Sequence, residues 1–147
     1  MECAYLALLP NGFRHEVHKT VTASDIHLWA ILTGDASPVY KVSAFAQQTT
    51  VERRVASDAY LTSLAVATVA SLAARLPPPG AMITMLRMHF AAPVLVGTTL
   101  SVVVTVKTWD TANALYWLDI CATSADGALA AFGAAGLRPH TSLFRAG

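Results

Sequence analysis

The sequence predicts an α+β domain in which an antiparallel β-sheet wraps around one long, buried helix. The segment Ala59–Arg75 has no charged side chain before its last residue, and its apolar residues fall on every side of a helical wheel. A helix that is apolar on all sides is enclosed by other elements rather than lying on a surface. Four strand-like segments follow, the last three joined by tight turns, which is typical of an antiparallel meander. We expect residues 1–147 to form a single domain of this kind.

The predicted helix has recognisable ends. Asp58 is expected to be its N-cap, because an Asp side chain accepts hydrogen bonds from the free amides of a first turn. Pro77-Pro78-Pro79-Gly80 ends it, since proline does not continue a helix. The helix is shorter than the ~20 residues that cross a bilayer. It also carries Ser and Thr side chains, so no membrane association is predicted.

The composition is apolar, with 54% hydrophobic and 13% charged residues. Charged surface is therefore scarce for a small domain, and we expect apolar surface to close the interface of a homodimer or heterodimer. A net charge of +1 argues against a nucleic-acid partner. Cys3 and Cys121 lack metal-ligand spacing, and we expect free thiols rather than a disulfide or a nucleophile. The N-terminal run 4–9 is unlike a secretory signal, so a cytoplasmic protein without metal or cofactor is predicted.

Before the long helix, the pattern predicts a strand and two short helices. The strand covers Phe13–Thr22, and Thr22-Ala23-Ser24-Asp25 has the form of a capping box that starts a helix. Gly34 is a suitable residue to end that helix. After a turn-rich connection, a weaker helix is expected over Lys41–Gln48. The inward face of the first short helix is predicted to carry Ile26, Trp29 and Ala30.

After the long helix, the pattern predicts four strands. Their expected ranges are Ala81–Phe90, Thr98–Trp109, Leu115–Thr123 and Ala128–Leu137. In the first of them, strict alternation would place Ile83, Met85, Arg87 and His89 on one side of the sheet and Met82, Thr84, Leu86, Met88 and Phe90 on the other.

Three short motifs, in this order, resemble the hotdog fold in its MaoC-like, (R)-specific enoyl-thioester hydratase form. The family pattern G-D-x-N-P-x-H is matched by Gly34–Tyr40, with Tyr in the place of His. The pattern R-x-A-H-G at the start of the long helix is matched by Arg54–Asp58, with Ser-Asp in the place of His-Gly. His89–Thr98 occupies the place of R-F-x-x-P-V-x-x-G-D. The resemblance covers roughly residues 17–139 and implies one hotdog domain.

The resemblance implies a site built from the first two motifs. In the family, the Asp and His of the first motif together activate one water, and Asp35 and Tyr40 occupy these positions. A backbone amide at the start of the long helix supports the thioester oxygen there, which implies that Ser57, Asp58 and Ala59 border the substrate. Partners implied by the family are an acyl-CoA or acyl carrier protein substrate and a second hotdog subunit.

The exchange of His for Tyr40 has a chemical consequence. An imidazole with a pKa of ~6.5 accepts and donates protons at neutral pH, whereas a phenol with a pKa of ~10 is almost wholly protonated. Asp35 is then the base, and Tyr40 an acid or an orienting group. In a simpler interpretation, Asp35 is only a turn residue and the Tyr40 ring only fills a pocket. Asp58 is interpreted first as a helix cap and second as a catalytic carboxylate.

Charged residues and a histidine supply further binding candidates. Glu52-Arg53-Arg54 is the densest charge cluster, and it is either a solvated loop or a site where Arg53 and Arg54 bind the phosphate of a carrier. His89 is on a strand that faces either the helix or a partner subunit. It is a candidate to contact the substrate, although a structural histidine is the simpler interpretation.

Three functions remain open at this stage. The first is an enzyme acting on an acyl thioester of CoA or carrier protein, by dehydration, hydration, isomerisation or cyclisation, in polyketide or fatty-acid-type metabolism. The second is a non-catalytic subunit of a heterodimeric hotdog dehydratase, because the motif His and the His-Gly pair are both replaced. The third is a thioesterase that uses Asp58 as base or nucleophile, which would leave Asp35 without a role.

Overall fold

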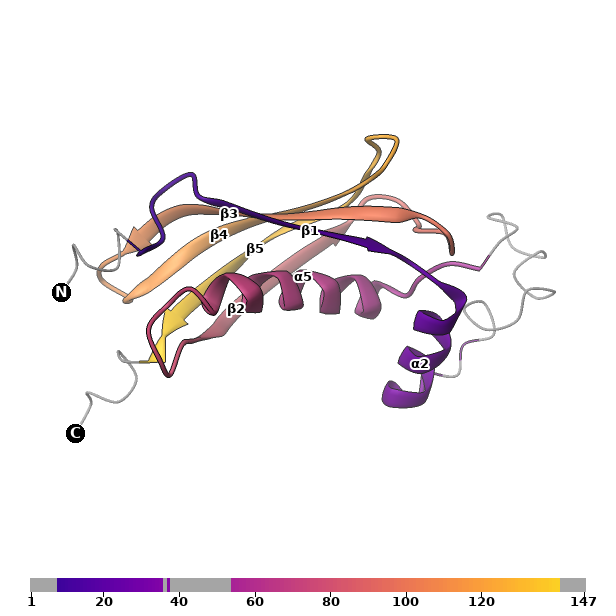
Figure 1. Cartoon of the computed structure of the whole chain (residues 1–147), viewed down its shortest axis with the longest axis horizontal. Helices are drawn as coiled ribbons and strands as arrows, with labels where there is room; N and C mark the ends of the chain where they lie inside the picture. Colours follow the sequence, from indigo (N-terminus) through magenta and orange to yellow (C-terminus); the bar gives the residue numbers. More distant parts are fainter. Residues whose placement is uncertain (1–7, 36, 38–53, 141–147) are drawn as a thin grey trace.

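A computed structural model describes residues 8–35, 37 and 54–140 of the chain. A five-stranded sheet, in the order β1-β3-β4-β5-β2 with every pairing antiparallel, covers a long helix (Figure 1). The predicted α+β class is thereby confirmed. The elements are β1 (Arg14–Thr20), α2 (Ala23–Thr33), α5 (Asp58–Ala73), β2 (Ala81–Phe90), β3 (Thr99–Asp110), β4 (Leu115–Ser124) and β5 (Leu129–Pro139).

The hydrophobic core fills the space between α5 and the inner face of the sheet. Leu61, Val69 and Leu72 of α5 are buried against alternate residues of the strands. The fully buried strand residues include Leu100, Val104, Tyr116, Leu118 and Ile120. The opposite side of α5 is not covered by described residues, because Ala67, Ala70 and Ser71 are exposed. The expectation that this helix is enclosed on all sides is therefore wrong for the described part of one chain.

The start of α5 differs from the expectation by one residue. Ser57, rather than Asp58, is the N-cap, and its Oγ accepts a hydrogen bond of 3.1 Å from the backbone N–H of Tyr60. Asp58 is instead the first residue of the helix, where a carboxylate interacts favourably with the helix dipole. The helix ends at Ala73, before the predicted Arg75.

The predicted features of α2 are confirmed. The Thr22 Oγ1 accepts from the backbone N–H of Asp25 at 3.1 Å, and an Asp25 carboxylate oxygen accepts from the backbone N–H of Thr22 at 2.8 Å. The helix stops at Gly34, whose φ of 72° is in the left-handed region that glycine adopts without strain. The buried face consists of Ile26 and Ala30, with Trp29 packed partly against the core.

Strand β2 departs from strict alternation. A bulge between Ile83 and Met85 shifts the register against β5. Leu86 and Met88 therefore pack against the core on the same face as Ile83, whereas strict alternation would place them on the other face. An extra residue in one strand reverses which face the following side chains occupy. His89 is consequently exposed on the outer face, where its ring stacks on Phe132 with centroids 5.0 Å apart.

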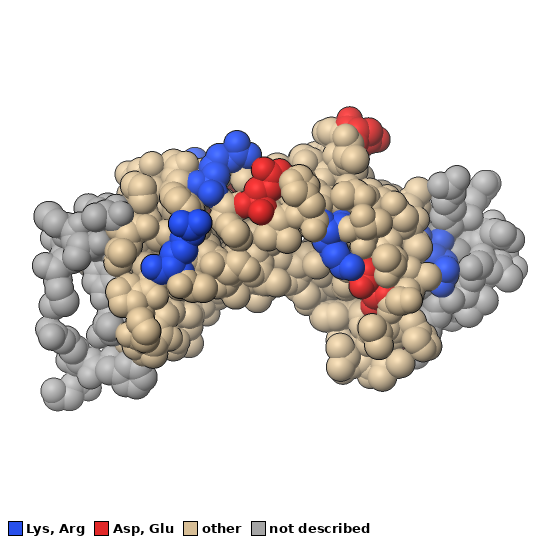
Figure 2. Space-filling model, in the orientation of Figure 1, with Lys and Arg blue, Asp and Glu red and all other residues tan. Residues whose placement is uncertain are grey.

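The exposed surface is sparsely charged. In Figure 2, Lys, Arg, Asp and Glu side chains occupy small separate areas of a mostly uncharged face. Large apolar side chains of α2 are exposed, with exposed fractions of 57% for Leu28, 65% for Ile31 and 80% for Leu32. Cys121 is a free, exposed thiol. None of the helices within the described ranges has the length and apolar character that a membrane span requires.

Candidate active site

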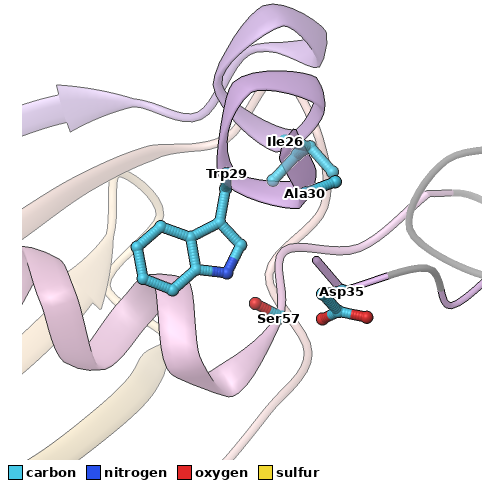
Figure 3. A pocket seen from close by; sticks show the side chains of 5 residues that line it. All are labelled: Ile26, Trp29, Ala30, Asp35 and Ser57. Atoms are coloured by element: carbon cyan, nitrogen blue, oxygen red, sulfur yellow. The ribbon is translucent and has the colours of Figure 1, made fainter. Parts of the chain in front are cut away.

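A small pocket lies where the end of α2 approaches the start of α5. Figure 3 shows its lining residues, which come from α2, from the turn after it and from the N-cap of α5. The pocket has an empty volume of about 180 Å³, and in this conformation it is too narrow to admit a water molecule. It is lined by Ile26, Trp29, Ala30, Asp35 and Ser57.

Asp35 forms the turn that the simpler interpretation gave it, and it also lines the pocket. Its Oδ1 accepts a hydrogen bond of 3.1 Å from the backbone N–H of Ser37, which is an Asx-type turn. The same carboxylate is half-buried and lines the pocket. The turn at Gly34 directs Asp35 towards the start of α5 rather than along the axis of α2 (Figure 3). The structural bond therefore holds the carboxylate at the pocket.

Ser57 lies opposite Asp35 at the start of α5. It is 5% exposed, and its Oγ caps the helix by accepting from the N–H of Tyr60. A hydroxyl that accepts one hydrogen bond keeps its proton available for donation. Ser57 thus brings a polar atom to the pocket without leaving the first turn of α5 unsatisfied.

The first amides of α5 lie beside the pocket. The backbone N–H groups of Asp58 and Ala59 belong to the four that have no partner within an α-helix. Together with the helix dipole they favour negative charge at this end of α5. The Asp58 side chain is exposed and does not line the pocket, so solvent weakens the repulsion between its charge and an anion there.

Two aromatic residues at the site were not identified as functional candidates from the sequence. Trp29 and Tyr60 meet in a T-shaped contact with ring centroids 6.1 Å apart. The Trp29 Nε1 is buried and has no hydrogen-bond partner among the described residues. An aromatic residue on the inward face of a helix has the same sequence pattern as any core residue, so nothing distinguished Trp29 beforehand.

Tyr60 is held in the neutral state by its surroundings. Burial raises the pKa of its phenol to about 12, and the negative charge of Asp25 adds to this effect. The hydroxyl makes no hydrogen bond with the described residues, so we attribute the effect of Asp25 to the charge of its carboxylate. Burial raises the pKa of Asp25 itself, but the nearby Lys19 and the Thr22 hydrogen bonds outweigh it and lower the pKa overall.

Among the candidates that the structure describes, Arg54 and His89 do not line this pocket. Tyr40 and Arg53, like the helix expected over 41–48, lie outside the described residues. Arg54 borders a separate open hollow beside Ala23 and His27. His89 is on the outer face of the sheet, against Phe132, so its contact with substrate stays a prediction.

Known proteins are similar to this chain in sequence and in fold. The family of MaoC like domains matches residues 8–114. The (R)-specific enoyl-CoA hydratase of Rhodospirillum rubrum is 34% identical over 102 residues, which are 69% of this chain and 69% of that protein. The solved structure of the (R)-hydratase from A. caviae involved in PHA biosynthesis has a TM-score of 0.79 at 27% identity, over 88% of this chain and 96% of that chain. The expected hotdog fold is thereby confirmed.

A two-subunit assembly also shares the fold. A chain in the structure of the ChsH1–ChsH2 complex from Mycobacterium tuberculosis has a TM-score of 0.77 over 88% of this chain and 97% of that chain. The sequence identity is 16%, so this likeness is one of fold alone.

Proposed function

We propose, since the chain belongs to the family of MaoC-like domains, that it is an enzyme that adds water to an enoyl thioester or removes it from a hydroxyacyl thioester. The observation that carries the proposal is the position of Asp35, whose carboxylate lines one pocket with the N-cap of α5. The similarity to the (R)-specific enoyl-CoA hydratase of Rhodospirillum rubrum supports an acyl thioester as the substrate.

In the hydration direction, the pocket widens to admit a water molecule, and Asp35 accepts a proton from it. The water oxygen bonds to the β-carbon of the enoyl group, the carbon–carbon π bond breaks, and the α-carbon takes up a proton. That proton comes from the Asp35 carboxyl that the water has just protonated, or from the Tyr40 phenol, to which Asp35 then passes its proton. The negative charge that develops on the thioester oxygen is stabilised by the free amides of α5. Because a phenol is a poor base at neutral pH, Tyr40 acts as the donor or orienting group in this scheme. Dehydration follows the same steps in reverse.

The carrier of the acyl group is part of the proposal. Coenzyme A and acyl carrier protein both present a phosphate, and Arg54 lies partly buried beside an open hollow between α2 and the start of α5. This position suits contact with a phosphate outside the pocket. We propose a CoA or carrier-protein thioester of fatty-acid or polyketide type, acted on by a hotdog dimer whose apolar contacts cover exposed residues such as Leu28 and Leu32.

The Asp35→Asn variant tests this function. With a short trans-2-enoyl-CoA as substrate, we expect turnover to fall below detection, because an amide does not accept the proton. Asp119→Asn is the matched control, since Asp119 is an exposed carboxylate that pairs with Lys107 at 3.0 Å on the outer face of the sheet. A folded Asp35→Asn protein with turnover equal to that of Asp119→Asn would refute the proposal.

A second candidate is a non-catalytic subunit of a heterodimer. It is favoured by the sequence at Tyr40 and at Ser57-Asp58, where three positions in two motifs of the family are replaced. Purification in complex with a second hotdog chain that carries the complete motif would support this role. A homodimer that turns over an enoyl thioester by itself would exclude it. Thioesterase activity through Asp58 is less favoured, because that side chain lies outside the pocket, and it requires thiol release that is lost in Asp58→Asn.

A further inference from the structure

We propose that the indole N–H of Trp29 donates a hydrogen bond to the carbonyl oxygen of the bound thioester, together with the first amides of α5. This inference rests on the proposed function and assigns a catalytic residue to it. The sequence motifs that suggested the site do not include Trp29.

The first observation is an unsatisfied donor. Trp29 Nε1 is buried and has no hydrogen-bond partner within the described part of the chain. In this conformation the pocket that it lines is too narrow for a water molecule, and it therefore has to widen before a substrate oxygen reaches this N–H. Leaving a buried donor unpaired is unfavourable, and such groups in folded proteins call for an explanation. A ligand acceptor supplies that explanation.

The second observation is the direction of the indole. In Figure 3 the nitrogen-bearing edge of Trp29 faces the side of the pocket where Ser57 and Asp35 lie. The side chain therefore directs its donor towards the start of α5, where the amides of Asp58 and Ala59 are also without helical partners. In the proposed contact, a single carbonyl oxygen with two lone pairs accepts from the indole N–H and from one of these amides.

The third observation is that neighbouring residues fix the indole. Trp29 packs against Tyr60 in the T-shaped geometry that aromatic pairs prefer. Tyr60 is itself buried in the first turn of α5. Asp25, whose charge acts on the Tyr60 phenol, forms an ion pair of 2.8 Å with Lys19. The donor is thus positioned before the substrate arrives, as electrostatic stabilisation of a transition state requires.

The catalytic carboxylate is the alternative acceptor, and the geometry argues against it. Asp35 and Trp29 line the same pocket, yet they form no hydrogen bond, and Asp35 Oδ1 is held by Ser37. A donor whose role was to orient Asp35 would already be bonded to it in the unliganded protein. The thioester oxygen is the acceptor that arrives only with the substrate.

The first test is the Trp29→Phe variant. Phenylalanine keeps an aromatic ring against Tyr60 but removes the N–H. We expect kcat to fall about 100-fold, which is the lower end of the loss when one donor to an oxyanion is removed, with a much smaller change in KM. The control is Trp117→Phe, which removes an indole that donates to Asp110 at 3.2 Å outside the pocket, and it should keep the wild-type kcat. An unchanged kcat in Trp29→Phe would overturn the inference.

The second test measures binding to the unmodified protein and does not depend on turnover. The unmodified protein, labelled with ¹⁵N, is titrated with hexanoyl-CoA and with hexyl-CoA, a thioether that lacks the carbonyl oxygen. We expect a downfield shift of the Trp29 indole proton with the thioester alone, while the Trp117 resonance stays in place. Equal responses to both compounds, or none to either, would overturn the inference.

The two tests also separate this inference from the proposed function. A selective indole shift in a protein without hydratase turnover would keep the Trp29 contact and refute the reaction. Turnover that depends on Asp35 but not on Trp29 would keep the proposed reaction and refute the Trp29 contact.

Discussion

The Oγ of Ser57 accepts a hydrogen bond of 3.1 Å from the backbone N–H of Tyr60, so a residue that lines the pocket also caps α5. Ser57→Ala removes the cap, and we expect the free energy of unfolding to fall by about 1 kcal/mol. Urea denaturation followed by circular dichroism measures this. Ser63→Ala, a serine of the same helix that bonds only to the carbonyl of Ala59, should change stability much less. Equal losses in the two variants would contradict the capping role.

The turn at Gly34 sets the position of Asp35, so its backbone conformation should matter for activity. With φ at 72°, Gly34→Ala is strained by about 1–2 kcal/mol, whereas Asn tolerates this region better. We expect Gly34→Ala to lower kcat for enoyl-thioester hydration more than Gly34→Asn does. Gly127→Ala, at a φ of 85° in the turn between β4 and β5, is the control, and it should lower stability without a specific loss of kcat.

The neighbouring strands β5 and β2 approach closely at Gly133. A Cβ at this position would lie 1.9 Å from the backbone oxygen of Arg87, and a backbone atom of a paired strand does not move aside easily. We expect Gly133→Ala to destabilise the protein by about 3 kcal/mol, the upper end of the usual cost of overpacking. At Gly136 the nearest atom would be 3.4 Å away, so Gly136→Ala should cost much less. Thermal unfolding of the two variants measures the difference.

The raised pKa of Tyr60 makes stability sensitive to alkaline pH. Its value is about 12 in the folded protein and 10.0 for the free side chain, so the unfolded chain loses this proton first as the pH rises. The stabilisation is complete below pH 10 and is lost between about pH 10 and 12. In that window the folded protein holds one proton more than the unfolded chain, so the unfolding constant changes by at most about tenfold per pH unit. We expect the stability of Tyr60→Phe to fall less steeply in this window. Parallel curves for the two proteins would contradict the linkage.

The lowered pKa of Asp25 makes stability sensitive to acidic pH, so that stability falls as the pH falls. Its pKa is lowered below 3.8 in spite of burial, because of Lys19 and Thr22. The unfolded chain therefore binds a proton before the folded one does as the pH falls. This stabilisation is present above the ordinary pKa of Asp and is lost as the pH falls through the lowered value. Asp25→Asn should be less stable than the unmodified protein at pH 7, and the difference should narrow towards pH 2 in chemical denaturation.

The sequence predicted the long helix, the strands and the capping box because each follows from local pattern or chemistry. The N-cap was assigned one residue late, since Ser57 and Asp58 are both good caps and only the path of the chain decides between them. Asp35 was found because a motif surrounds it. Trp29 was not, because a donor without a partner is a property of three-dimensional packing and has no sequence pattern.

The bulge in β2 has a practical meaning for anyone who attaches a probe or compares this strand with a relative. Positions counted from Ala81 change side after Ile83, so Arg87 and His89 are suitable for labelling while Leu86 and Met88 are not. An alignment that treats Ala81–Phe90 as one regular strand would equate surface positions with core positions over its second half. The strand is better treated as two short segments, before and after Thr84, in which the alternation of inward and outward side chains has opposite phase.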